Sequence, residues 1–222
     1  MEELSDLSIN ISKDQLFENL GGATNSRPSP RSEHQMSEAI QTIHESTNVR
    51  GVYKIFPVHT NREFIHVNGG SRLESKRLSH VLSLCENVAV FVLTLGTEVD
   101  CVIQENATDR LSYSTVLDAA ASIAAESGAQ SMEDLIEKTL SEDEGSTMRY
   151  SPGYCDWPLK DQGKIFDLLS PDVAGVRLSS ECLMSPRKSV SGIIGIGPSE
   201  VVKKHIHACS KCNRIDCSYR RM

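Results

Sequence analysis

Apolar residues recur along the chain with two periods, one typical of helices and one typical of strands. Helical spacing marks the segments at about 12–20, 32–45, 75–85, 97–104, 111–140 and 160–169. Alternating or continuous apolar runs rich in β-branched residues mark strands at about 53–58, 64–67, 87–95, 176–178 and 189–197. The pattern predicts helices and strands mixed along the chain, and it contains no internal repeat.

Two of these segments are the most informative about the core. The run at 87–95 is almost entirely apolar, which predicts a strand buried on both faces. The helix at 111–140 is rich in alanine between Asp118 and Glu126, and such small side chains let a helix lie close against a sheet. We expect this strand and this helix to form the centre of the fold.

Composition and charge narrow the classes of function. The chain has 222 residues, 39% of them hydrophobic and 24% charged, as in an ordinary globular protein. Its net charge of −7 argues against nucleic acid or an anionic membrane as a partner of the body of the protein. No apolar run reaches the roughly 18 residues that span a bilayer, and the acidic start Met-Glu-Glu-Leu is unlike a secretory signal. We therefore expect a cytoplasmic protein.

The strongest candidate for ligand binding is the segment 149–159, Arg-Tyr-Ser-Pro-Gly-Tyr-Cys-Asp-Trp-Pro-Leu. Arg149 offers a planar fork of N–H donors that suits a carboxylate or phosphate. Gly153 follows a proline in a predicted turn and lets a ligand approach the backbone. Tyr154 and Trp157 supply flat apolar faces with polar tips. An arginine before a turn can also simply cap a neighbouring helix, so the motif alone leaves both interpretations open.

The seven cysteines are distributed unevenly, and their odd number favours free thiols and a metal site over a disulfide framework. Cys209, Cys212 and Cys217 are spaced closely enough to share a zinc ion or an iron–sulfur cluster. Three residues are candidates for a fourth ligand: His205, His207 and Cys182. The alternative is a tail of free thiols, and its basic residues would also suit docking on an acidic partner. Cys85 and Cys101 are expected to be small core residues.

Three segments together resemble a known family. They are the buried strand ending in Thr94-Leu-Gly96, the segment from Arg149 through Gly153-Tyr154 to Pro158, and Pro186-Arg-Lys-Ser-Val-Ser-Gly192. In this order they are similar to the activation domain of cobalamin-dependent methionine synthase. The resemblance implies an α+β fold with a twisted antiparallel sheet flanked by helices.

The resemblance also implies an organisation of the chain in three parts. Residues 1–48 would form an N-terminal helical segment and linker, and residues 49–200 would form the activation domain. Residues 201–222 would be a basic tail rich in cysteine, at a place where the long enzymes of the family continue with aromatic residues.

For the ligand, the resemblance implies S-adenosylmethionine bound in a shallow groove. Arg149 would take the methionyl carboxylate, Tyr154 would pack on the ligand, and Gly153 would permit its approach. The backbone of Ser151 lies in the same loop. Glu126 would be the helix carboxylate near the cationic sulfonium and amino groups, whose charge favours it.

The activity that the resemblance implies is reductive reactivation of cobalamin. An external electron donor returns one electron to cob(II)alamin, and S-adenosylmethionine then methylates the cobalt. The chain lacks the cobalamin signature Asp-x-His-x-x-Gly, so the corrinoid would be carried by a partner methyltransferase, most simply a split methionine synthase that serves methionine biosynthesis. The metal is then the nucleophile, and no side chain of this chain is expected to be catalytic.

Two alternatives belong to other classes. In the first, the chain is a metal-binding or electron-transfer module that docks on a corrinoid protein without methyl transfer. In the second, its basic tail binds nucleic acid through a metal site, which the acidic body of the protein disfavours.

Overall fold

The computed structural model describes residues 2–5, 7–23, 26–61, 63–68, 70–170 and 172–202. The helices are α1 (Lys13–Asn19), α2 (Pro30–Ser46), α3 (Lys76–Val81), α4 (Thr97–Asp109), α5 (Leu111–Lys138) and α6 (Gln162–Leu169). The strands are β1 (Glu2–Leu4), β2 (Arg50–Thr60), β3 (Phe64–Val67), β4 (Ser71–Glu74), β5 (Asn87–Thr94), β6 (Glu144–Ser146), β7 (Arg177–Leu178), β8 (Met184–Ser185) and β9 (Ser189–Pro198). Short 3-10 turns lie at Leu82–Leu84, Leu159–Asp161 and Val173–Gly175.

Seven of these strands form one antiparallel sheet. Its order is β4-β3-β2-β5-β9-β6, and β1 pairs with the N-terminal end of β2 beside this path. Strand β5 lies in the centre and is paired along its whole length with β2 on one side and β9 on the other. The predicted antiparallel sheet flanked by helices is therefore confirmed, and so is the burial of its central strand on both faces.

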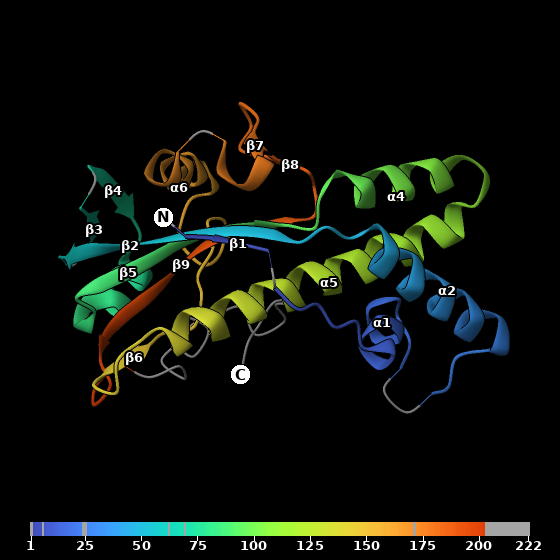
Figure 1. The fold of residues 1–222 in the computed structure, drawn as a ribbon, viewed down its shortest axis with the longest axis horizontal. Coiled ribbons are helices and arrows are strands. Elements are labelled where there is room, and N and C mark those ends of the chain that lie inside the picture. The colour runs from blue at the N-terminus through green and yellow to red at the C-terminus, as the bar shows by residue number, and fades with distance from the viewer. Residues whose placement is uncertain are drawn as a thin grey trace.

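The two faces of the sheet contribute to different cores because side chains alternate along a strand. On β5, Val88, Val90 and Val92 face the core beneath α6, whereas Ala89, Phe91 and Leu93 face the core formed with α5. Figure 1 shows the result as layers, with α6 and the β7–β8 hairpin on one side of the sheet and α5 on the other. Strand β5 thus separates the two cores.

Helix α5 extends beyond the sheet, and its N-terminal half packs among other helices (Figure 1). Helices α1, α2 and α4 gather around this half, at the right of Figure 1. Their core is built around Leu16, Met36, Ile43, Leu95 and Leu117, all fully or almost fully buried. Helix α5 therefore holds the sheet part and the helical part of the molecule together.

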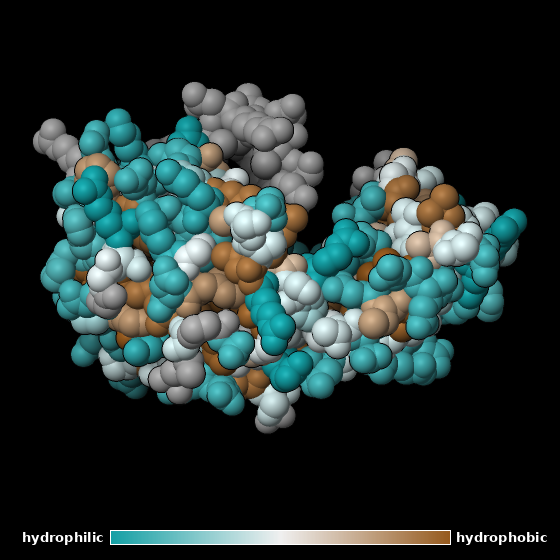
Figure 2. Space-filling view, turned by 90° about the horizontal axis from the view of Figure 1, so that it is seen from above, coloured by the Kyte–Doolittle hydropathy of each residue, from teal (hydrophilic) through white to brown (hydrophobic). Residues whose placement is uncertain are grey.

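Seen from above, the molecule has a larger part at the left, over the sheet, and a smaller helical part at the right, with an indentation in its outline between them (Figure 2). Hydrophilic and apolar residues are interspersed on this face. Among the described residues, no helix combines the length and the apolar character that crossing a bilayer requires.

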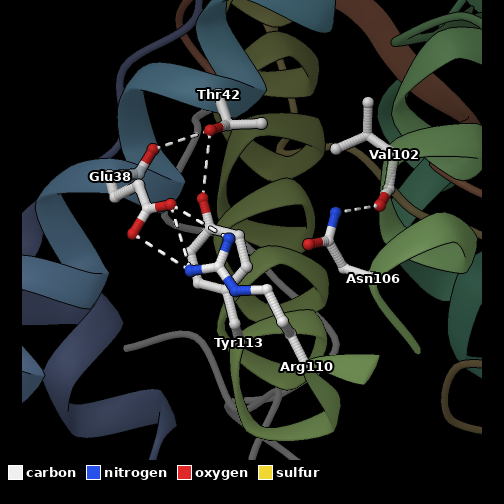
Figure 3. Close-up of polar contacts among 6 residues, drawn as sticks. All are labelled: Glu38, Thr42, Val102, Asn106, Arg110 and Tyr113. Carbon is white, nitrogen blue, oxygen red and sulfur yellow. Dashed lines mark hydrogen bonds and ion pairs between the residues drawn. The ribbon is translucent and has the colours of Figure 1, made fainter. Parts of the chain in front are cut away.

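A group of polar contacts, which we call the Arg110 brace, joins Arg110 and Tyr113 to Glu38 and Thr42 at the corner between α4 and α5. Arg110, the residue between the two helices, donates hydrogen bonds from both terminal nitrogens to the Glu38 carboxylate on α2, at 3.1–3.3 Å (Figure 3). The guanidinium also lies 4.0 Å from the centre of the Tyr113 ring, a cation–π contact. The Tyr113 hydroxyl in turn lies 3.1 Å from that of Thr42. These contacts tie α2 to the start of α5.

We predict that Arg110→Ala lowers the free energy of unfolding by about 1 kcal/mol, because a half-exposed ion pair and a cation–π contact are lost together. Urea denaturation of the wild type and the variant measures this change. Arg31→Ala, which removes an exposed arginine of α2, is the control and should change stability by less than about 0.5 kcal/mol. Equal effects of the two substitutions would show that the brace contributes nothing.

The predicted elements recur in the structure with shifted ends, and four short strands were not predicted. The region 160–169 is split into a 3-10 turn and α6, while β1, β4, β6 and β8 carry too few residues to show a periodic pattern. The expectation for Cys101 was wrong, because it lies exposed on α4, whereas Cys85 is buried as expected. The division of the chain at residues 48 and 200 stays a prediction.

Burial raises the pKa of the Cys85 thiol to about 12. Since only the thiolate is alkylated, we predict that iodoacetamide at pH 8 modifies Cys85 on the order of a thousandfold more slowly than an ordinary thiol. Cys101 is exposed and serves as the internal control. Peptide mass spectrometry of the native and the urea-unfolded protein measures both sites. Similar rates for the two cysteines in the native protein would contradict the prediction.

Candidate functional site

A one-residue bulge in the segment after β6 determines where Arg149 points. Ser146 lies opposite Ile196 of β9, but Tyr150 lies opposite Ile193, so four steps along one strand match three along the other. An extra residue of this kind shifts the alternation of side chains to the other face. Tyr150 therefore packs against the core beneath α6, and Arg149 is directed to the opposite face, toward α5.

Arg149 is almost completely buried and is held by three residues of α5. One terminal nitrogen, Nη1, donates to Glu133 at 2.7 Å and to Gln130 at 3.1 Å, and the other, Nη2, donates to Glu126 at 2.8 Å. The spacing of the three acceptors, four and then three residues apart, places them on one side of the helix. The Glu133 side chain is 2% exposed and that of Glu126 is 51% exposed. The Arg149 ion pairs thus run from the interior to the surface.

A second cation engages the same side of α5 closer to its start. Lys188, the residue before β9, forms an ion pair with Asp118 at 2.9 Å and donates to the Ser122 hydroxyl at 2.9 Å. Asp118, Ser122 and Glu126 are four residues apart, so these contacts and those of Arg149 form a single polar row along α5. Within it, three carboxylates face two cations, which leaves a formal charge of −1.

The loop after Arg149 is fixed by its own backbone and by an aspartate. The amide of Gly153 donates to the carbonyl of Trp157 at 2.9 Å, which closes the loop. Gly153 has a φ of 91°, a conformation that favours glycine. The carboxylate of Asp156 accepts from the Ser75 hydroxyl and from the first two amides of α3. The loop is therefore tied both to itself and to α3.

Trp157 is part of the core and does not offer a face to a ligand. It is 3% exposed and packs in the core beneath α6. Its indole N–H donates to the buried carboxylate of Asp161 at 3.1 Å, and Asp161 also accepts from the Glu74 amide and pairs with Lys164. The interpretation of Trp157 as a ligand contact was wrong, because its side chain packs into the core and attaches the loop to it. Tyr154, in contrast, is 40% exposed.

The structure brings two of the predicted ligand residues into direct contact, since Arg149 and Glu126 form an ion pair although they are distant in sequence. Ser151, Gly153 and Tyr154 lie in the loop that follows Arg149, and Tyr154 is its exposed aromatic residue. Gln130 and Glu133 were not predicted. The spacing of polar residues on α5 after Glu126 is the signal that could have identified them.

The predicted metal ligands Cys209, Cys212 and Cys217, with His205 and His207, lie outside the described residues. Cys182 is described, and it is half-buried with its sulfur 3.9 Å from the carbonyl oxygen of Lys160. Within the described ranges, no three His, Cys, Asp or Glu side chains are grouped in a way that could hold a metal ion. The metal site thus stays a prediction.

Comparison with known protein families gives a match to the vitamin B12 dependent methionine synthase, activation domain, over residues 80–214. The chain belongs to this family. The matched residues run from α3 through the central strand, α5, the Arg149 loop and β9, so they include every residue of the polar row on α5. The resemblance inferred from the sequence motifs is confirmed.

A solved structure shows the same fold for more of the chain than the family match covers. The activation domain described here is similar to the crystal structure of the MetH reactivation domain bound to AdoHcy, with a TM-score of 0.65 and 20% sequence identity. The similarity covers 89% of this chain and 78% of that chain. No curated protein matches the sequence.

Gly192 controls the approach of the Arg149 segment to β9. A methyl group at this position would lie 2.5 Å from the Tyr150 carbonyl oxygen, which is paired with the Ile193 amide at 2.8 Å. We predict that Gly192→Ala lowers the free energy of unfolding by about 1–3 kcal/mol, because backbone must move to make room. Thermal and urea denaturation measure the change.

Gly163 of α6 provides the control for this substitution. A methyl group there meets no atom within 4 Å, so Gly163→Ala should leave stability unchanged or raise it by up to about 1 kcal/mol. If Gly192→Ala is as well tolerated as Gly163→Ala, the close contact with Tyr150 is not a constraint on the site.

Proposed function

We propose that this activation domain binds S-adenosylmethionine beside the polar row on α5 and supports the reactivation of cobalamin carried by a partner methyltransferase. The observation that carries the proposal is the ion pair between Arg149 and Glu126, which places a carboxylate receptor next to a surface carboxylate. S-adenosylmethionine has the complementary groups, a carboxylate beside an ammonium and a sulfonium. The crystal structure of a similar fold with AdoHcy supports the same ligand class.

Arg149 retains the donors that such a ligand needs. A guanidinium has five N–H groups, and the contacts to Gln130, Glu133 and Glu126 use three of them. By this count Nε–H and one Nη2–H remain for a further acceptor, and they belong to adjacent nitrogens. A carboxylate accepts from two such donors in a bidentate arrangement. We assign the methionyl carboxylate to this edge of Arg149.

The rest of the ligand has partners of matching chemistry. Glu126 is half-exposed and carries the charge that attracts the ammonium and sulfonium groups. Tyr154 presents an exposed aromatic ring on the loop after Arg149, suited to packing on the ligand. Gly153 and the backbone of Ser151 form the part of the loop that the ligand approaches.

The role of the chain in the reaction is positional. Reactivation needs one electron from an external donor to reduce cob(II)alamin, and then a bond between the sulfonium methyl group and cobalt, with S-adenosylhomocysteine as the leaving group. The reduced cobalt of the partner is the nucleophile, so the domain supplies neither base nor nucleophile. It holds the methyl donor in a geometry suited to attack. The partner is accordingly a corrinoid methyltransferase, and methionine synthesis is the activity we propose for the assembly.

Isothermal titration calorimetry with S-adenosylmethionine tests the ligand. We predict saturable binding to the wild type and a loss of about 2 kcal/mol or more of binding free energy in Arg149→Ala, because a charged hydrogen-bonded pair is removed. Arg177→Ala, in an exposed arginine of β7, is the control and should bind like the wild type. Circular dichroism of all three proteins excludes loss of the fold.

An absence of binding to the folded wild type would overturn the proposal for the isolated domain. Equal affinity of the wild type and Arg149→Ala would keep the ligand and remove Arg149 from the site. The role in reactivation is measured separately, as methylation of a cob(II)alamin-loaded partner in the presence of an electron donor, with and without the domain.

A further inference from the structure

We propose that Glu133 and Gln130 are positioning residues that orient the Arg149 guanidinium and thereby make the site selective for ligands that carry a carboxylate. This inference rests on the proposed function and adds to it the residues that determine specificity. Neither side chain needs to touch the ligand, since both act through Arg149.

The first observation is that both acceptors bind the same terminal nitrogen. Nη1 donates one hydrogen to Glu133 and the other to Gln130. A planar guanidinium held through both hydrogens of one nitrogen cannot turn within its own plane without breaking one of these bonds. The Nε and Nη2 edge, the one assigned to the ligand carboxylate, is therefore fixed in direction before the ligand arrives, which is the arrangement that lowers the cost of ordering on binding.

The second observation is that each acceptor is itself held. The Glu133 side chain is 2% exposed and belongs to the buried residues of α5, so its position is set by packing. The Gln130 amide nitrogen donates to Asp134 at 3.0 Å, which directs its oxygen toward Arg149. Buried and supported partners of this kind are what a rigid binding site requires.

Charge and orientation act in opposite directions at Glu133, and this makes the inference testable. As a negative charge, Glu133 weakens the attraction of Arg149 for a ligand carboxylate, so its neutralisation alone would strengthen binding. As an orienting partner, it keeps the guanidinium from turning about its contact with Glu126, whose side chain is exposed and imposes less constraint. If orientation dominates, neutralising Glu133 weakens carboxylate recognition. Replacing Gln130, which changes no charge, weakens it as well.

The experiment compares two ligands that differ only in the carboxylate, S-adenosylmethionine and decarboxylated S-adenosylmethionine. Their dissociation constants are measured by calorimetry, with competition where binding is weak, for the wild type, Glu133→Gln and Gln130→Ala. The quantity of interest is the ratio of the two constants. We expect the wild type to prefer S-adenosylmethionine. This preference should fall about tenfold in Glu133→Gln, where a charged acceptor becomes a neutral one, and about fivefold in Gln130→Ala, where a neutral acceptor is removed.

Two controls separate orientation from stability and from remote charge. A substitution that merely loosens the fold weakens both ligands equally and leaves the ratio unchanged, so an unchanged ratio in both variants overturns the inference. Gln130 is exposed, and Gln130→Ala should therefore fold even if Glu133→Gln does not. Glu105→Gln removes the same charge from an exposed position on α4 and should keep the wild-type ratio.

The remaining outcomes are also decisive. An increased preference for S-adenosylmethionine in Glu133→Gln would show that Glu133 affects binding only through its negative charge. This result would overturn the positioning role. If the wild type binds both ligands equally well, the ligand carboxylate does not contact the Nε and Nη2 edge of Arg149. A wild type that binds neither ligand contradicts the proposed function itself, and this failure is distinct from the others.

Discussion

The ion pairs of Arg149 with α5 are the interaction on which the arrangement of this site depends. They join the edge of the sheet, next to β9, to the longest helix of the fold. A buried ion pair adds little net stability compared with apolar residues of the same size, yet removing one partner costs about 3–5 kcal/mol. Such a pair is poorly explained by stability alone. It is well explained by a demand for a guanidinium with a fixed direction.

Helix α5 connects this site to the remainder of the molecule. Its C-terminal half packs against the sheet, and its N-terminal half is surrounded by α1, α2 and α4. The Arg110 brace fixes the corner at which the helix begins, and Lys188 attaches the helix to the start of β9. The polar row is therefore presented by a helix that is packed along its length and tied near its start, so its carboxylates have defined positions relative to the sheet.

The sequence was sufficient for the features that depend on local patterns and insufficient for those that depend on pairing. The run at 87–95 predicted the central strand because burial on both faces leaves an unbroken apolar stretch. The bulge before Tyr150 could not be predicted, since it exists only relative to the register of β9. Without it the direction of Arg149 could not be derived, although the spacing of polar residues after Glu126 marks Gln130 and Glu133 as its neighbours on α5. Trp157 was misassigned because an aromatic residue in a loop can face either the ligand or the core.

The bulge has a consequence for how related sequences are compared. Side chains in this segment alternate between two layers, so Arg149 reaches α5 only while Tyr150 stays opposite Ile193. If the regular register continued from Ser146 without a bulge, the same residues would place Tyr150 opposite Gly192 and exchange the two layers. The pairing of Tyr150 with Ile193 is thus as much a part of the site as the arginine. A relative can lack the extra residue and still direct its arginine to the helix, provided that the residue after the arginine keeps this pairing.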